Sequence, residues 1–104
     1  MMSDTEVTKV VFRKFQGEIV ALFPEEAATL NPILCTSYTH VGQHSAAEYY
    51  SVLTSSKQAT DAEAADLKAE LESIGYNLRV YKRSPSDAYQ KRKDQIKDYL
   101  NSAN

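Results

Sequence analysis

The sequence predicts an α+β domain, with a mainly antiparallel four-stranded sheet and about three helices in the order ββ-β-α-α-β-α. Two runs of β-branched and aromatic residues flank a Gln-Gly pair near the N-terminus, which is the pattern of a β-hairpin. Further along, apolar residues recur at helical spacing over Ala62–Ile74. With 104 residues there is room for one hydrophobic core, so we expect a single domain over 7–101 behind a disordered segment at 1–6.

The first two strands are expected to form the hairpin. Val7–Phe15 is the first, and Gln16-Gly17 is a two-residue turn, because glycine accepts the positive φ that tight hairpins need. Glu18–Phe23 returns as the second strand and is expected to end at Pro24. Its side chains are apolar on both faces, which is typical of a strand that is central in its sheet or covered on both sides.

A third strand and a first helix are predicted next. Ile33–Val41 is rich in residues that favour strands, and Gly42 is expected to end it. Ser45 and Glu48 have the spacing of a capping box, in which each side chain satisfies a backbone N–H of the first helical turn. The predicted helix therefore runs over Ala46–Ser55.

The second helix, over Ala62–Ile74, has the clearest pattern in the chain. Its apolar positions recur at spacings of three and four, and Thr60 and Glu63 provide an N-terminal cap. Gly75 is its expected C-terminal stop.

One more strand and one more helix follow. Tyr76–Arg83 alternates between apolar and polar residues, as a strand does. Ser84 as the N-cap and Pro85 at the first helical position predict a helix that reaches about Leu100.

Composition excludes several classes of protein. The net charge of −2 argues against a surface that binds nucleic acid all over, and the single cysteine, Cys35, excludes a disulfide framework. No apolar run approaches the roughly 20 residues of a membrane span, and charged residues interrupt the N-terminal region where a signal peptide would lie. We therefore expect a cytoplasmic protein that does not contact membranes.

The main candidate site is the segment 38–44, where a polar, aromatic strand end meets the predicted first helix. Free N–H groups at a helix N-terminus attract anions and small polar ligands, and a histidine can act as a general base. The same side chains could instead serve only to cap that helix. The candidate ligand-binding residues are Tyr38, His40, Gln43 and His44, with Arg13 as a possible neighbour.

An enzyme or metal site centred on His40 and His44 is an alternative. Their four-residue separation puts both imidazoles on one side of the chain. A catalytic zinc site needs three protein ligands, so Cys35, Glu48 or another chain would have to complete it. No motif with known metal-ligand or catalytic spacing is present, so we predict no metal and no cofactor, and we favour a protein that is not an enzyme while keeping the enzyme as an alternative.

Nucleic-acid binding through the C-terminal region is a second alternative. Seven of the 12 basic residues lie between positions 79 and 97, with tyrosines interleaved, as phosphate contacts and base stacking would require. Three aspartates dilute this charge, which is common on a solvated helix face. The residues that would carry this binding are Arg79, Lys82, Arg83, Lys91 and Arg92.

Three stretches resemble a group of short uncharacterised bacterial and phage-borne proteins. They read F-R-K-F-Q-G-E-I-V-A-L-F-P from Phe12 to Pro24, S-Y-T-H-V-G-Q-H from Ser37 to His44, and L-E-S-I-G-Y-N-L from Leu71 to Leu78. The resemblance covers most of residues 8–83. It implies a bacterial or mobile-element origin and no particular activity, and the C-terminal helix departs from the pattern.

Taken together, these observations favour a small, non-enzymatic binding or regulatory protein. Its partner would be another protein or a small polar ligand, bound at 38–44, and the chain is a possible homodimer.

Overall fold

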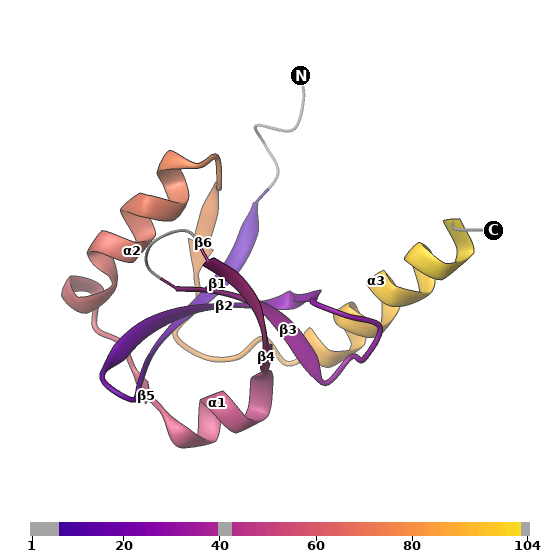
Figure 1. Cartoon of the computed structure of the whole chain (residues 1–104), viewed down its shortest axis with the longest axis horizontal. Helices are drawn as coiled ribbons and strands as arrows, with labels where there is room; N and C mark the ends of the chain where they lie inside the picture. Colours follow the sequence, from indigo (N-terminus) through magenta and orange to yellow (C-terminus); the bar gives the residue numbers. More distant parts are fainter. Residues whose placement is uncertain (1–6, 40–42, 103–104) are drawn as a thin grey trace.

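The fold is α+β, as predicted, with three helices and a mostly antiparallel sheet in the described part of the chain (Figure 1). The computed structural model describes residues 7–39 and 43–102. The elements are β1 (Thr8–Phe15), β2 (Glu18–Ala27), β3 (Leu34–Thr39), β4 (Gln43–Glu48), α1 (Tyr49–Ser55), β5 (Lys57–Gln58), α2 (Asp61–Ser73), β6 (Leu78–Val80) and α3 (Ala88–Ser102).

In the described residues the sheet has six strands, two more than predicted. Five run in the order β4-β3-β2-β1-β5, and β6 pairs with β1 beside this row. The extra strands are β4 and the two-residue β5. The predicted fourth strand shrinks to the three residues of β6, which pairs with the first half of β1 in parallel. The second half of β1 pairs with β5. Two short strands thus share the outer edge of β1.

Helices cover both faces of the sheet (Figure 1). On one face, α2 packs against a core whose largest sheet residues are Phe12, Phe23 and Tyr38. On the other, α1 and the start of α3 pack on Val20, Leu22 and Cys35. Because β2 lies in the middle, it is buried on both sides, which explains why its sequence is apolar at successive positions.

The β1–β2 hairpin forms where it was predicted. Gln16 has φ 52° and Gly17 has φ 82°, and positive values at both turn residues are the signature of a type I′ hairpin turn. Beyond the turn, however, β2 does not end at Pro24. It continues to Ala27, with a register shift against β3 between Phe23 and Ala27. Such an irregularity accommodates a residue that cannot donate to the ladder.

The predicted helix over 46–55 is wrong in its first three residues. Residues 43–48 form β4, which pairs with β3 at every position, and α1 begins only at Tyr49. Glu48 stands at the N-cap and makes no side-chain capping bond. Pairing with a strand that precedes it in the chain therefore overrides the local Ser45–Glu48 signal.

The second helix follows the prediction closely. In α2 the Thr60 Oγ1 accepts from the Glu63 N–H at 3.1 Å, and Glu63 Oε1 accepts from the Thr60 N–H at 2.9 Å. This is a complete capping box. Gly75 follows the helix with φ 113°, a backbone conformation suited to glycine.

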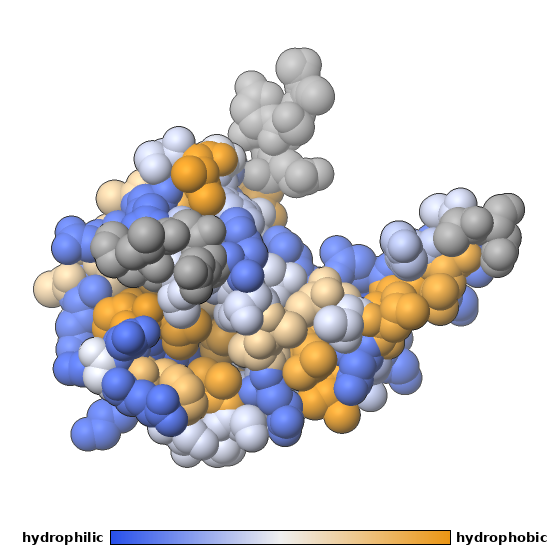
Figure 2. Space-filling view, in the orientation of Figure 1, coloured by the Kyte–Doolittle hydropathy of each residue, from blue (hydrophilic) through white to orange (hydrophobic). Residues whose placement is uncertain are grey.

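The last helix starts later than predicted and extends away from the sheet. It begins at Ala88, because the Ser84 hydroxyl accepts from Tyr49 and donates to the Pro85 carbonyl instead of capping a helix. Figure 2 shows hydrophobic side chains along the projecting part of α3. Tyr99 is 64% exposed and Leu100 46%. None of the helices in the described ranges is long and apolar enough to cross a membrane.

Candidate functional site

The sheet places Tyr38 at the centre of one candidate site. In the register, Ala21 of β2, Tyr38 of β3 and His44 of β4 form one row across the sheet, on the face that α2 covers. The Tyr38 ring is buried, and its hydroxyl donates to Glu70 Oε2 of α2 at 2.5 Å. The row therefore ties β3 to the helix through a polar bond at the rim of the core.

His44 and Tyr76 complete an aromatic wall beside this row. The His44 ring meets the Tyr38 ring edge-on at 4.7 Å between centroids, and its Nε2 lies 2.9 Å from the Tyr76 hydroxyl. The Tyr76 ring stacks on Phe23 at 5.2 Å with an interplanar angle of 12°. Four rings from β2, β3, β4 and the segment after α2 thus pack together; Phe23 and Tyr38 are buried, and His44 and Tyr76 reach the surface.

Glu26 adds a second carboxylate to this surface. It is partly buried, and burial raises its pKa, while the nearby His44 opposes that shift. Burial and the Glu26 charge in turn raise the pKa of Tyr76. Within residues 7–39 and 43–102, no hydrogen bond or ion pair reaches the Glu26 carboxylate.

We call these six residues the aromatic–acid cluster: Phe23, Glu26, Tyr38, His44, Glu70 and Tyr76. Aromatic faces and carboxylates both attract cations. Residues 43–48 are a strand and α1 begins only at Tyr49, so the helix N-terminus expected at Ala46, which was the predicted basis for anion binding, does not form there. The chemistry of the cluster therefore suits a positively charged group.

Arg13 does not join the cluster, contrary to prediction. It lies opposite Val20, on the face that α1 covers. Its Nε donates to Ser56 Oγ at 2.8 Å, and its Nη2 donates to the carbonyls of Leu53 and Ser56 at 3.0 and 2.7 Å. The guanidinium therefore caps the C-terminal end of α1, because side chains alternate along β1 and position 13 faces away from Tyr38.

The remaining predicted ligands are placed only in part. Gln43 starts β4 opposite Thr39, and His40 lies outside the described residues. Cys35 faces the opposite core, where burial raises its thiol pKa to about 11. In the described ranges no group of three His, Cys, Asp or Glu side chains could hold a metal ion.

Sequence reasoning missed Glu26, Glu70 and Tyr76. Glu70 reads as one more acidic position of an amphipathic helix, and Tyr76 as the first residue of a strand. Glu26 lies in what reads as a loop after Pro24. Only the register of the sheet and the docking of α2 bring the three beside Tyr38 and His44, so no local pattern identifies them.

The five predicted nucleic-acid residues do not all lie on the surface. Arg92 is fully buried: its Nε donates to the Pro32 carbonyl at 2.7 Å and its Nη1 to the Pro24 carbonyl at 2.6 Å. It is thus a structural anchor for α3 and is removed from any phosphate contact. Lys82 is paired with Asp61. Arg79, Arg83 and Lys91 are exposed.

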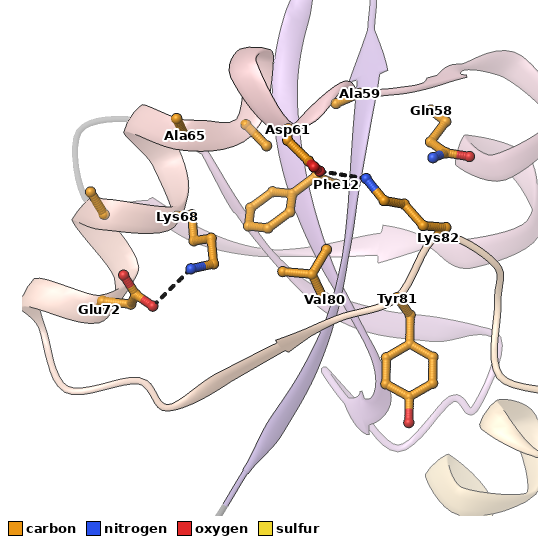
Figure 3. Close-up of a pocket in the computed structure, with 12 residues that line it drawn as sticks. Phe12, Gln58, Ala59, Asp61, Ala65, Lys68, Glu72, Val80, Tyr81 and Lys82 are labelled. Carbon is orange, nitrogen blue, oxygen red and sulfur yellow. Dashed lines mark hydrogen bonds and ion pairs between the residues drawn. The ribbon is translucent and has the colours of Figure 1, made fainter.

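A separate groove of about 530 Å³ runs between α2 and the end of β6 (Figure 3). Phe12, Ala65 and Val80 are among its apolar lining residues. Its rim carries two ion pairs, Lys68–Glu72 at 3.1 Å and Lys82–Asp61. Since the charges in each pair neutralise each other, we expect the groove to attract a charged ligand less than the aromatic–acid cluster does.

Comparison with protein-family models, curated proteins and solved structures finds no match. The function therefore has to be inferred from the geometry and chemistry of the site. Within the described residues, the aromatic–acid cluster combines ring faces, a partly buried carboxylate and residues drawn from distant parts of the chain.

Proposed function

We propose that this protein is a non-catalytic binding protein that recognises a positively charged group at the aromatic–acid cluster. The group would be the ammonium or guanidinium of a basic side chain on a partner protein. The observation that carries the proposal is Glu26, a partly buried carboxylate that makes no hydrogen bond or ion pair within the described residues, although the nearby His44 lowers its pKa. Burying a charge is costly unless it is paired, and a bound cation would offset that cost.

The neighbouring rings support a cation over a neutral ligand. A cation over an aromatic face gains about 0.5–2 kcal/mol, depending on how far it is desolvated. Phe23 and Tyr76 are stacked, and Tyr38 is buried and bonded to Glu70. Side chains held in this way lose little conformational entropy when a ligand binds, and this favours binding.

The existing hydrogen bonds support binding over catalysis. The Tyr38 hydroxyl is engaged by Glu70, and His44 Nε2 is engaged by Tyr76. A general base must be within hydrogen-bond reach of the proton that it abstracts. Here Tyr38 and His44, the two polar rings that could act as a base, already form hydrogen bonds within the cluster.

A titration followed by NMR tests the proposal. Choline and butylammonium would be added to the labelled protein, and the ring resonances of His44 and Tyr76 would be followed. The neutral isostere 3,3-dimethylbutan-1-ol and inorganic phosphate serve as ligand controls. Glu26→Gln is the test variant, and Glu18→Gln is its control, because Glu18 is an exposed carboxylate at the hairpin.

We expect both cations to shift these resonances, and the neutral alcohol to shift them far less. Glu26→Gln should weaken cation binding about tenfold or more, which corresponds to about 1.4 kcal/mol. Glu18→Gln should bind like the wild type. Equal shifts from choline and the alcohol, or preferential binding of phosphate, would show that the cluster does not recognise cations.

A further inference from the structure

Strand β4 forms one edge of the sheet, and its sequence lacks the usual protection of an edge. It pairs with β3 along its whole length and, in the described part of the chain, with no other strand. Residues 44–48 read His-Ser-Ala-Ala-Glu and contain no proline and no lysine. Proteins commonly use those residues, or a bulge, to prevent edge strands from pairing with another chain. The β3–β4 register has no such irregularity.

The hydrogen bonds show which backbone groups of β4 point outward. The Tyr49 N–H donates to the Ile33 carbonyl at 3.3 Å, and the Leu34 carbonyl accepts from Ala28 on the β2 side. In an antiparallel ladder, alternate residues direct their backbone groups to opposite neighbours. The odd-numbered residues of β4 therefore bond to β3. Its even-numbered residues His44 and Ala46 present their N–H and C=O groups outward. Glu48 presents only its N–H outward, because as the N-cap of α1 its C=O accepts the first hydrogen bond of that helix.

This outward edge is complementary to itself. If a second β4 runs antiparallel with Ala46 opposite Ala46 of the partner subunit, His44 lies opposite Glu48 of the partner subunit. All three outward residues then meet outward residues. The Ala46 pair exchanges two N–H···O bonds, and each His44–Glu48 pair forms one, from the Glu48 N–H to the His44 carbonyl. The Glu48 carboxylate can accept an N–H of the His44 imidazole across the strands, and alanine at the centre offers no steric obstacle.

We infer that β4 is a homodimerisation edge, through which two copies join their sheets about a two-fold axis at Ala46. The contact is isologous, as in most homodimers. Glu48 of the partner subunit would reach the exposed His44, so each copy would add a carboxylate beside the aromatic–acid cluster of the other. A single strand edge is smaller than the roughly 800 Å² per partner of stable interfaces, so the dimer should exchange with monomer.

Sedimentation velocity over micromolar to millimolar protein, with two variants at the dyad, tests the inference. Ala46→Pro removes an N–H that points outward. It removes no hydrogen bond between β4 and β3, because the backbone N–H of Ala46 does not bond to β3. Ala46→Ser keeps that N–H and is the matched control. We expect concentration-dependent dimers for the wild type and Ala46→Ser. Ala46→Pro should stay monomeric, with an unchanged circular dichroism spectrum.

A charge variant covers the case in which Ala46→Pro fails to fold. Glu48→Lys removes the carboxylate that would accept from His44 of the partner subunit, at both symmetric pairs, and should weaken the dimer more than tenfold. Glu18→Lys makes the same charge change at the exposed hairpin and should have no effect. In mixed samples of labelled and unlabelled protein, an intermolecular NOE should join Ser45 Hα to Ala47 Hα of the partner subunit, which identifies the register.

Two outcomes would overturn the inference. One is a wild-type protein that stays monomeric at millimolar concentration. The other is a dimer that survives Ala46→Pro and Glu48→Lys but is lost in Tyr99→Ser, which would place the interface on the exposed apolar side of α3. Neither outcome bears on cation recognition, because choline binding is measured on the monomer as well as on the dimer.

Discussion

Tyr38 and Glu70 are 32 positions apart in the sequence, and the Tyr38 hydroxyl donates to the Glu70 carboxylate at 2.5 Å. This bond joins the third strand of the sheet to α2 at the edge of the core. It fixes the buried Tyr38 ring, against which His44 packs. The candidate site therefore depends on how α2 docks on the sheet.

Tyr38→Phe should show how much this bond contributes. The variant keeps the buried ring but removes the hydroxyl, so we expect the free energy of unfolding to fall by about 1 kcal/mol. Urea unfolding would measure it. Glu70→Gln completes a double-mutant cycle, and additive losses in the double variant would mean that the two side chains are not coupled.

Glu26 should make the protein less stable as the pH rises through the acidic range. Burial raises its pKa, with His44 opposing, so the folded state holds the proton more tightly than the unfolded chain does. Stability from this group is greatest below the ordinary glutamate pKa. This contribution to the free energy of unfolding falls as the pH rises from the ordinary glutamate pKa to the raised pKa of Glu26. Above that pKa it stays at the lower level.

The variant Glu26→Gln checks this direction. It should be more stable than the wild type at neutral pH, and its advantage should shrink as both proteins are acidified. Urea unfolding across the acidic range measures the difference, with Glu18→Gln as the control. A stability difference that does not change with pH would contradict the assigned cause.

Arg92 should be essential for anchoring α3. Besides its bonds to the Pro24 and Pro32 carbonyls, its guanidinium lies 5.0 Å from the centroid of the Tyr49 ring. Arg92→Ala leaves both carbonyls without this donor and opens a cavity, so we expect a loss of about 3 kcal/mol.

The adjacent exposed Lys91 provides the control, since Lys91→Ala should change stability by less than about 0.5 kcal/mol. Chemical unfolding of both variants measures the difference. If both variants lost similarly little stability, the hydrogen bonds of the buried Arg92 guanidinium would stabilise the fold no more than its loss of hydration destabilises it.

Cys35 should resist thiol reagents in the folded protein. It is fully buried, and burial raises its pKa to about 11, so little thiolate is present at neutral pH. We expect labelling by a disulfide reagent to be slow and to speed up on addition of urea. A cysteine placed at the exposed position by Ser51→Cys should react at once, and equally fast reaction of Cys35 would contradict its burial.

Elements with a complete local signal were predicted correctly. The β1–β2 hairpin needs only Gln16-Gly17 between two apolar strands, and α2 needs only its capping box and apolar spacing. Where two signals competed, local reasoning failed. Residues 43–48 contain a helix-capping pattern, yet they form a strand that pairs antiparallel with β3.

The candidate site divides in the same way. Tyr38 and His44 were singled out from the sequence because both lie in one polar, aromatic segment. Glu26, Glu70 and Tyr76 were not, because each belongs to a different element and reads as an ordinary surface or strand residue. Arg13 and Arg92 were assigned to binding surfaces, whereas both guanidinium groups hold helices in place.

Local patterns are enough to predict the α+β class, the hairpin, α2 and the segment around which the candidate site forms. These features depend on turn chemistry, capping and apolar spacing, which act over a few residues. Three other features become visible only in the folded chain: 43–48 is an edge strand, Glu26 and Glu70 lie near Tyr38 and His44, and Arg92 is buried. Those outcomes depend on contacts between distant segments, whose energies a linear pattern does not display.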